Sequence, residues 1–176
     1  DYSQGSKPKF VGASVDSGPV SLYGVNQTVD GVQDRRGLGL EYRYYEDKKT
    51  AYALVDYDAY FKAVNAAQLM GAVGALGGTM NFMVDHRKTP SLSIRTALNG
   101  ATTSSVNDLL QTMSASSLRT LALERTAQSN MGQVGLSVPL SKKWQVGGDV
   151  RVTNTSGLPA SGTTALEGIL AATPSR

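Results

Sequence analysis

The chain has 176 residues, of which 40% are hydrophobic and 18% charged, and these values suit one domain of ordinary size. Its formal net charge is only +3 and its basic residues are scattered, so nucleic-acid binding has little support. The absence of cysteine excludes a disulfide framework and a thiolate metal site, and it weakly favours an envelope protein that avoids stray disulfides.

Hydrophobic and polar residues alternate along most of the chain, which is the pattern of a β-strand with one apolar face. Most of the predicted strands approach the roughly 9–11 residues that a tilted strand needs to cross a bilayer. The eight predicted strands cover residues 9–15, 20–28, 37–45, 50–58, 65–76, 79–88, 128–139 and 144–154.

Residues 65–84 (NAAQLMGAVGALGGTMNFMV) contain no charged side chain. They have three interpretations: a membrane-spanning helix, a buried soluble helix or a β-hairpin. The glycines, asparagines and glutamine in this run argue against a transmembrane helix. Gly77-Gly78 suits the positive φ angles of a two-residue hairpin turn, and the alternation continues on both sides of it. The sequence therefore favours two strands.

The connections between the predicted strands alternate in length. The short connections are 16–19, 46–49, 77–78 and 140–143; the longer ones are 29–36, 58–65, 89–127 and everything after Asn154. Outer-membrane barrels have short periplasmic turns and longer external loops, whereas a soluble β-sandwich has no reason to sort its loops in this way. The predicted fold class is therefore all-β: an antiparallel up-and-down transmembrane β-barrel with about eight strands.

Both ends of the predicted strand series fall on the long-loop side. Complete single-chain barrels normally start and finish at the periplasmic turns, and they commonly end in a strand with a terminal aromatic residue rather than in ALEGILAATPSR. Residues 1–176 are therefore predicted to be an internal part of a larger barrel. Closure by eight strands alone is the alternative.

Residues 89–127 interrupt the alternation and are predicted to form an external loop insertion with two short helices, within SSVNDLLQTM and SASSLRTLALERTA. Ser104 or Ser105 is a candidate cap for the first helix, and Ser114, Ser116 or Ser117 for the second. The helical spacing is carried by Val106, Leu109, Leu110 and Met113, and by Leu118, Leu121, Ala122 and Arg125. Two interpretations stay open: helices folded over their own loop, or a lid or plug that narrows a channel.

If one face of the strands meets lipid, the other meets the lumen. The residues predicted to face lipid, including an aromatic girdle, are Leu38, Leu40, Tyr42, Tyr44, Tyr57, Phe82, Trp144, Val146, Val150 and Val152. The predicted lumen-facing charges are Glu41, Arg43, Asp56, Asp58, Asp85, Arg87, Asp149 and Arg151. These charges are interpreted either as a constriction that filters small polar solutes or as a salt-bridge network inside a polar wall. Ordinary cross-strand packing is the alternative for the aromatic residues.

No catalytic residue, metal ligand or cofactor is predicted, and the chain is not expected to be an enzyme. His86 is the only histidine, no GxSxG element accompanies it, and its parity is opposite to that of Asp85, so a structural or interfacial role is expected. Asp56 with Asp58 could bind calcium if a loop supplied further oxygens, but a solvated pair is the expectation. The Gly-rich run 71–78 lacks the spacing of a dinucleotide-binding loop.

Five segments carry a resemblance to a known group of proteins. They are NQTVDGVQDRRGLGLEYRYYEDKKTAYALVDYD, LNGATTSS, DLLQTM, LRTLALERTA and LSVPLSKKWQVGGDVRVTNTSGLPASG. Together they resemble the barrel region of large proteobacterial outer-membrane proteins, some of which carry TPR-like repeats upstream. The resemblance covers most of 26–162 and implies a location and a fold more than a task. This sequence departs from the group in lacking the upstream repeats and a closing C-terminal strand.

These observations predict part of an outer-membrane β-barrel that acts as a pore or an export-associated channel with a charged lumen. A non-conducting barrel that docks an envelope or surface partner is the first alternative, and a soluble antiparallel binding domain is the second. The expected location is the cell outer membrane. The expected partners are its lipid and lipopolysaccharide, together with other envelope proteins or further strands of the same barrel.

Overall fold

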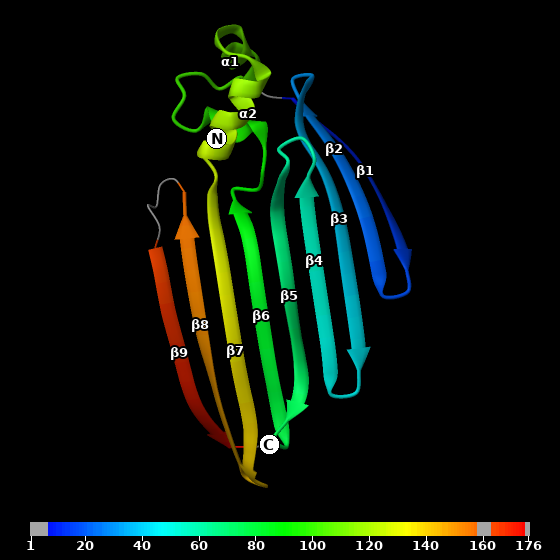
Figure 1. The fold of residues 1–176 in the computed structure, drawn as a ribbon, viewed down its shortest axis with the longest axis vertical. Coiled ribbons are helices and arrows are strands. Elements are labelled where there is room, and N and C mark those ends of the chain that lie inside the picture. The colour runs from blue at the N-terminus through cyan, green and yellow to red at the C-terminus, as the bar shows by residue number, and fades with distance from the viewer. Residues whose placement is uncertain (1–6, 158–162, 175–176) are drawn as a thin grey trace.

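The computed structural model describes residues 7–157 and 163–174 of the chain. Nine strands form one antiparallel sheet, and their order in the sheet follows the sequence from β1 to β9 (Figure 1). The predicted all-β, antiparallel up-and-down architecture is therefore confirmed, and all eight predicted strands are present. The sheet is not closed, because β1 and β9 are its two edges.

The strands are β1 (Pro8–Ser17), β2 (Val20–Val29), β3 (Val32–Glu46), β4 (Lys49–Asp58), β5 (Ala63–Ala75), β6 (Gly78–Thr89), β7 (Ala127–Ser141), β8 (Trp144–Ser156) and β9 (Thr163–Pro174). Three helical elements lie between β6 and β7. They are the 3₁₀ helix η1 (Ile94–Leu98), the helix α1 (Val106–Thr112) and the helix α2 (Ala115–Glu124).

The connections at one end of the sheet, the tight-turn end, each contain two residues: Gly18-Pro19, Asp47-Lys48, Leu76-Gly77 and Lys142-Lys143. Leu76 and Gly77 have φ angles of 54° and 75°, which is the left-handed backbone that a two-residue hairpin turn requires. The hairpin predicted within residues 65–84 is confirmed, with its turn one residue earlier than the sequence indicated.

The opposite end of the sheet, the helical end, differs from the prediction at residues 29–36. These residues are not a long loop, because Asp30-Gly31 joins β2 to β3 directly. The two residues have φ angles of 53° and 82°, as in the Leu76-Gly77 turn. The register then shifts between Gln27 and Thr28, which makes Asp34 the extra residue of a β-bulge on β3. A bulge interrupts the alternation of apolar and polar residues, so the sequence pattern did not reveal the first third of β3.

The expectation that the chain beyond Asn154 is a loop is wrong for Thr163–Pro174, which pairs with β8 as β9. The segment TTALEGILAATP places Ala165 beside Leu166 and Ile169 beside Leu170, so its apolar residues do not alternate. The strand runs back to the tight-turn end, so the series of strands does not finish on the long-loop side. The two edge strands, β1 and β9, run in the same direction (Figure 1).

The hairpin turns form a staircase at the tight-turn end (Figure 1). One row of paired residues crosses the sheet: Val20, Tyr42, Ala53, Leu69, Val84, Gly132 and Val152. Val20 directly follows the Gly18-Pro19 turn, whereas Val152 lies about nine residues beyond Lys142-Lys143. The turns therefore step steadily along the strand direction from β2 to β8.

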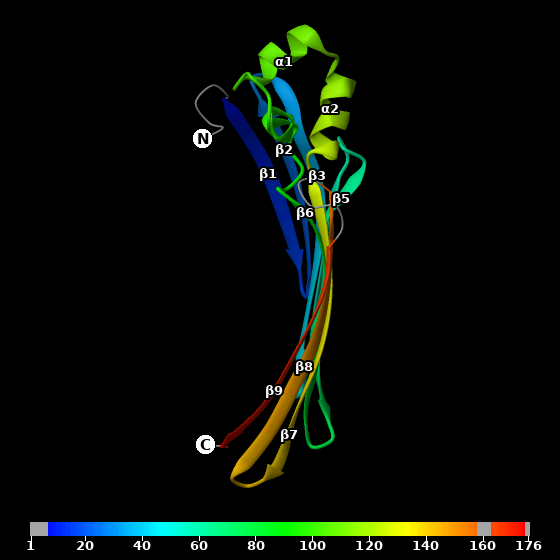
Figure 2. The same ribbon diagram turned by 90° about the vertical axis from the view of Figure 1, so that its left-hand side faces the viewer.

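The sheet is a single curved layer. Both edges, β1 and β9, bend toward the same side (Figure 2), and the segment that carries η1 lies on this concave side at the helical end. The buried hydrophobic residues form one small cluster at that end: Val29, Phe61, Leu92, Ile94, Ala97, Leu98, Val106, Leu118 and Ala122. Most of the sheet therefore has no second layer among the described residues.

The two predicted helices are confirmed, and their caps explain where they begin. The Ser105 hydroxyl accepts a hydrogen bond from the backbone N–H of Asn107, and the Ser114 hydroxyl accepts one from Ser117. Leu118 and Ala122 face the buried cluster one helical turn apart. The sequence did not predict η1, whose N-cap is Ser93.

Candidate functional site

The register of the sheet assigns its side chains to two faces. Side chains alternate along a strand and paired residues point to the same side, so each row of paired residues belongs to one face. Leu40 pairs with Leu22 and with Val55, whereas its neighbour Glu41 pairs with Ser21 and with Leu54. We call the first face the apolar face and the second the polar face.

The apolar face of β2–β8 carries fourteen large hydrophobic or aromatic side chains that are 36–59% exposed. They are Leu22, Leu38, Leu40, Tyr42, Tyr44, Val55, Tyr57, Leu69, Met80, Val84, Val134, Trp144, Val150 and Val152. Val134 pairs with Val150, and both are more than half exposed although they lie midway along β7 and β8. All ten residues that the sequence predicts to face lipid lie on this face, Phe82 and Val146 included.

Charged residues on the apolar face of β3–β8 lie only near the ends of the strands. Arg36 and Lys88 lie at the helical end, and Glu46 and Lys49 lie at the tight-turn end. His86 lies on this face as predicted by its parity, and its Nδ1 is 2.7 Å from Oδ1 of Asn130 on the paired strand. The middle of the face is a continuous apolar surface.

The polar face holds all eight charged residues that the sequence assigns to a lumen, but the structure distributes them over four groups. Arg43 Nε donates to Glu41 Oε1 at 2.6 Å, and Arg87 donates twice to Asp85, at 2.6 Å each. The third group is Asp149 and Arg151 on β8, which are linked by Gln133 of β7: its amide donates to Asp149 at 3.4 Å and accepts from Arg151 at 3.1 Å. The fourth group contains Asp56 and Asp58.

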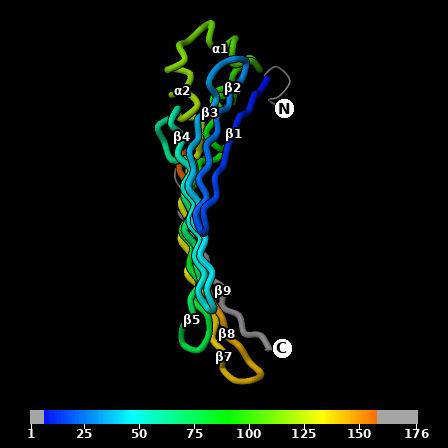
Figure 3. Tube along the Cα trace, turned by 90° about the vertical axis from the view of Figure 1, so that its right-hand side faces the viewer, coloured from blue at the N-terminus to red at the C-terminus, as the bar shows by residue number. Residues whose placement is uncertain are grey.

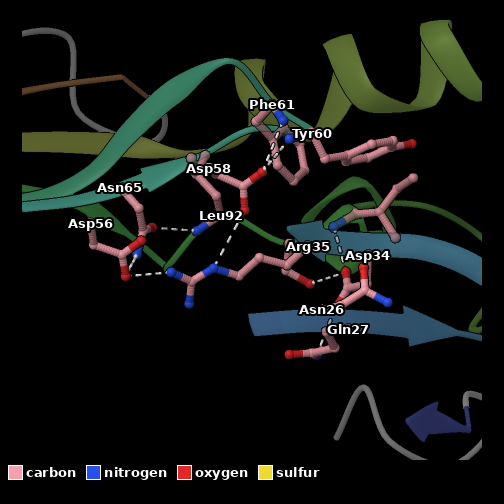
Figure 4. A network of polar contacts seen from close by, with 12 residues as sticks. Asn26, Gln27, Asp34, Arg35, Asp56, Asp58, Tyr60, Phe61, Asn65 and Leu92 are labelled. Atoms are coloured by element: carbon pink, nitrogen blue, oxygen red, sulfur yellow. Dashed lines mark hydrogen bonds and ion pairs between the residues drawn. The ribbon is translucent and has the colours of Figure 1, made fainter. Parts of the chain in front are cut away.

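Arg35 organises this fourth group on the polar face at the helical end (Figure 4). Its guanidinium forms an ion pair with Asp56, and its Nε lies 3.4 Å from Oδ2 of Asp58, which is fully buried. The other oxygen of Asp58 accepts hydrogen bonds from the backbone N–H groups of Tyr60 and Phe61, at 2.9 Å each. Asp58 therefore fixes the β4–β5 connection, so the expectation of a solvated pair with Asp56 is wrong.

Two further buried polar residues complete this region, Asp34 and Asn65 (Figure 4). Sequence reasoning missed both of them, together with Arg35. Asp34 and Arg35 lie in the stretch that was assigned to a loop, and Asn65 lies at the start of a predicted strand with no charge to mark it. The strand alternation could have found Arg35, because positions 41, 39, 37 and 35 all fall on the face that carries Glu41.

A pocket of about 390 Å³ lies between the polar face and the segment before α1. It is lined mainly by polar side chains, among them Gln27, Asp34, Arg35, Arg95 and Asn99. In α2, Arg119 donates to the carbonyl of Tyr60 at 3.1 Å, and its guanidinium lies 5.7 Å from the Tyr60 ring centre. Burial raises the pKa of the Tyr60 phenol, and the nearby Arg119 charge acts in the opposite direction.

No group of three or more metal-ligating side chains occurs in the described part of the chain. No helix within residues 7–157 is long and apolar enough to cross a bilayer. Comparisons of the chain with protein-family models, with curated proteins and with solved structures give no significant match.

Proposed function

We propose that the chain forms part of the wall of a transmembrane β-barrel in an outer membrane, with the apolar face toward lipid and the polar face toward a water-filled lumen. The barrel conducts small polar solutes or serves an export pathway. Because β1 and β9 run in the same direction, an all-antiparallel closed wall needs an odd number of further strands between them, from this or another chain.

The observation that carries this proposal is the continuous exposed apolar face. Contiguous apolar patches on soluble monomers rarely exceed a few hundred Å², and larger ones mark contact with protein or membrane. Here the apolar surface spans seven neighbouring strands, while charge is confined to the opposite face and to the strand ends. Alternation of lipid-facing and lumen-facing residues is the pattern of a barrel wall.

The staircase of turns supports the same proposal. The turns shift by about eight residues between β2 and β8, which is roughly 27 Å along the strand direction. The six strand spacings between β2 and β8 correspond to about 29 Å across the sheet. Strands must therefore tilt by about 43° to bring the turns to one level. This value falls within the roughly 35–45° tilt of membrane barrels.

The spacing of the flanking charges also fits a bilayer. Arg36 and Glu46 limit the apolar stretch of β3, and they are ten positions apart. At about 3.3 Å per residue and a tilt near 43°, this separation gives an apolar band roughly 24 Å tall. The lipid-facing band of outer-membrane barrels is about 25 Å tall.

Labels attached to the two faces test the orientation. The protein has no cysteine, so each substitution to cysteine introduces a unique attachment point. We expect labels on Leu40→Cys and Val150→Cys to report acyl chains and labels on Leu54→Cys and Gln133→Cys to report water. Water contact at Leu40 and Val150, in a protein that stays soluble without detergent, would contradict the proposal.

Conductance in planar bilayers tests the pore. A second candidate function, a non-conducting barrel that docks an envelope or surface partner, is favoured by the folded helices that extend beyond the sheet at the helical end (Figure 1). Discrete conductance steps support the pore. A folded protein whose labels pass the orientation test and which conducts no ions supports the docking barrel instead.

A further inference from the structure

Two β-bulges on the polar face each supply one residue that binds the insertion between β6 and β7. The register shift between β2 and β3 makes Asp34 an extra residue, and the shift between β4 and β5 does the same for Asn65. A bulge re-aims the side chain of its extra residue and is common beside functional sites. Both residues are buried, at 0% and 5% exposure.

Asp34 makes more hydrogen bonds to the insertion than Asn65 does. Its Oδ1 accepts hydrogen bonds from the backbone N–H of Ile94 and from the Ser93 hydroxyl, at 2.7 Å each. Its Oδ2 accepts from Gln27 Nε2 at 2.6 Å, which holds the carboxylate against the neighbouring strand. The carboxylate therefore binds the start of η1, and Ser93 is also the cap of that helix.

Asn65 makes the second contact. Its Oδ1 accepts from the backbone N–H of Leu92 at 2.8 Å, and its Nδ2 donates to Asp56 at 3.4 Å (Figure 4). Through Asp56, this amide is connected to Arg35 and to the ion-pair group of the wall. Leu92 and Ile94 are both fully buried or nearly so, at 1% and 0% exposure.

These contacts hold the segment 91–95 on the concave side of the sheet. The segment lies where a closed wall would have its lumen (Figures 2 and 3). The pocket of about 390 Å³ lies between this segment and β2–β3. The rest of the insertion is attached to the β4–β5 connection by Arg119, which donates to the Tyr60 carbonyl. Within the insertion, Arg125 donates to the Ala97 carbonyl at 2.5 Å.

We propose that Asp34 and Asn65 are positioning residues that dock the segment 91–95 onto the inner wall as a fixed constriction, and that they thereby set the size limit for solutes. This inference rests on the proposed pore. Bulge residues suit this task because their backbone is freed from the ladder while their strands stay paired, so the wall itself is not weakened. The segment is a stationary part of the lumen rather than a lid that opens.

The test compares the wild-type protein in lipid vesicles with Asp34→Ala, Asn65→Ala and the double variant. Asp34→Asn keeps an oxygen acceptor and serves as the conservative variant. Gln68→Ala is the matched control, because Gln68 lies on the same face and its amide donates to Asp85 at 3.3 Å rather than to the insertion. Heat-modifiable gel mobility confirms that each variant is folded.

Two measurements are made on each protein: hydrogen exchange of the Leu92 and Ile94 amides, and vesicle permeation by a graded series of neutral oligosaccharides. Loss of a buried hydrogen bond to a charged acceptor changes stability enough to accelerate local exchange by about tenfold or more. We expect that acceleration and a larger size limit in the double variant, a smaller effect in Asp34→Asn, and no change in Gln68→Ala.

Unchanged exchange in the folded double variant would overturn the docking contacts. Faster exchange with an unchanged size limit would overturn the constriction. If neither the wild type nor the double variant passes the smallest sugar or any ions, while exchange responds as expected, the proposed pore fails and the docking contacts stand. The two failures are therefore distinguishable.

Discussion

At the scale of single residues, Arg35 has a different environment from Arg87, which lies on the same polar face. Its side chain is 18% exposed and lies between two carboxylates whose side chains are 10% and 0% exposed. Arg87, by comparison, is 55% exposed beside Asp85. A buried charge without its partner is costly, whereas an exposed ion pair contributes little.

We therefore predict that Arg35→Met destabilises the protein by about 3–5 kcal/mol, because Asp56 and Asp58 lose their counter-ion in a buried region. Arg87→Met is the matched control and should cost about 0–1 kcal/mol. Urea unfolding in lipid or detergent measures both values. Equal costs for the two substitutions would show that the Arg35 group is solvated.

At the scale of elements, the tight turns depend on close approach of neighbouring strands. Gly78, the first residue of β6, faces the backbone of β7, and a Cβ at this position would lie 1.8 Å from the carbonyl oxygen of Ser137. Gly132 lies in the middle of β7, and a Cβ there would meet no atom within 4 Å. The same substitution therefore has opposite consequences at the two positions.

Gly78→Ala should destabilise the β5–β6–β7 region by about 1–3 kcal/mol or more, because a backbone atom must move to accommodate the new methyl group. Gly132→Ala should be tolerated, since the added methyl group enters open space on the apolar face. Thermal unfolding of the two variants beside the wild type gives the comparison. A melting temperature that falls as far for Gly132→Ala as for Gly78→Ala would contradict this account of the strand contact.

At the scale of the whole molecule, the sheet has one layer, and its only buried hydrophobic cluster in the described residues lies at the helical end. Protein domains normally bury an apolar face against a second layer of structure. The apolar face of β2–β8 has no such layer in the described chain, and hydrocarbon would take that place in the proposed wall. Leu40 of β3 and Leu54 of β4 are both leucines on paired strands, but Leu40 lies on the apolar face and Leu54 on the polar face.

Leu40→Arg should therefore cost about 2–4 kcal/mol of stability in lipid, the value expected for a cation at the middle of a lipid-facing surface. Leu54→Arg should be close to neutral, because it adds a charge to the polar face. Unfolding titrations in lipid vesicles measure the difference. If Leu40→Arg is neutral or improves solubility, the apolar face meets water and the soluble alternative is correct.

Particular residues show how much could be predicted from the sequence. Alternation in 37–45 and 144–154 was sufficient to place Leu38, Leu40, Val150 and Val152 on one face, because strand parity is a local property. It failed at Asp34, where a bulge adds one residue, and in β9, where apolar residues stand side by side. In both cases the missing information was the pairing with a neighbouring strand.

The sequence by itself determined eight of the nine strands in the described residues, the turns of the tight-turn end, the two capped helices and the division into an apolar and a polar face. Each of these follows from φ/ψ preferences, capping or a period of two, which act over a few residues. Only the tertiary structure decided the stagger of the hairpins, the curvature of the sheet and the docking of Leu92 and Ile94 onto Asn65 and Asp34. These features depend on contacts between residues far apart in the chain, such as the 60 positions that separate Asp34 from Ile94.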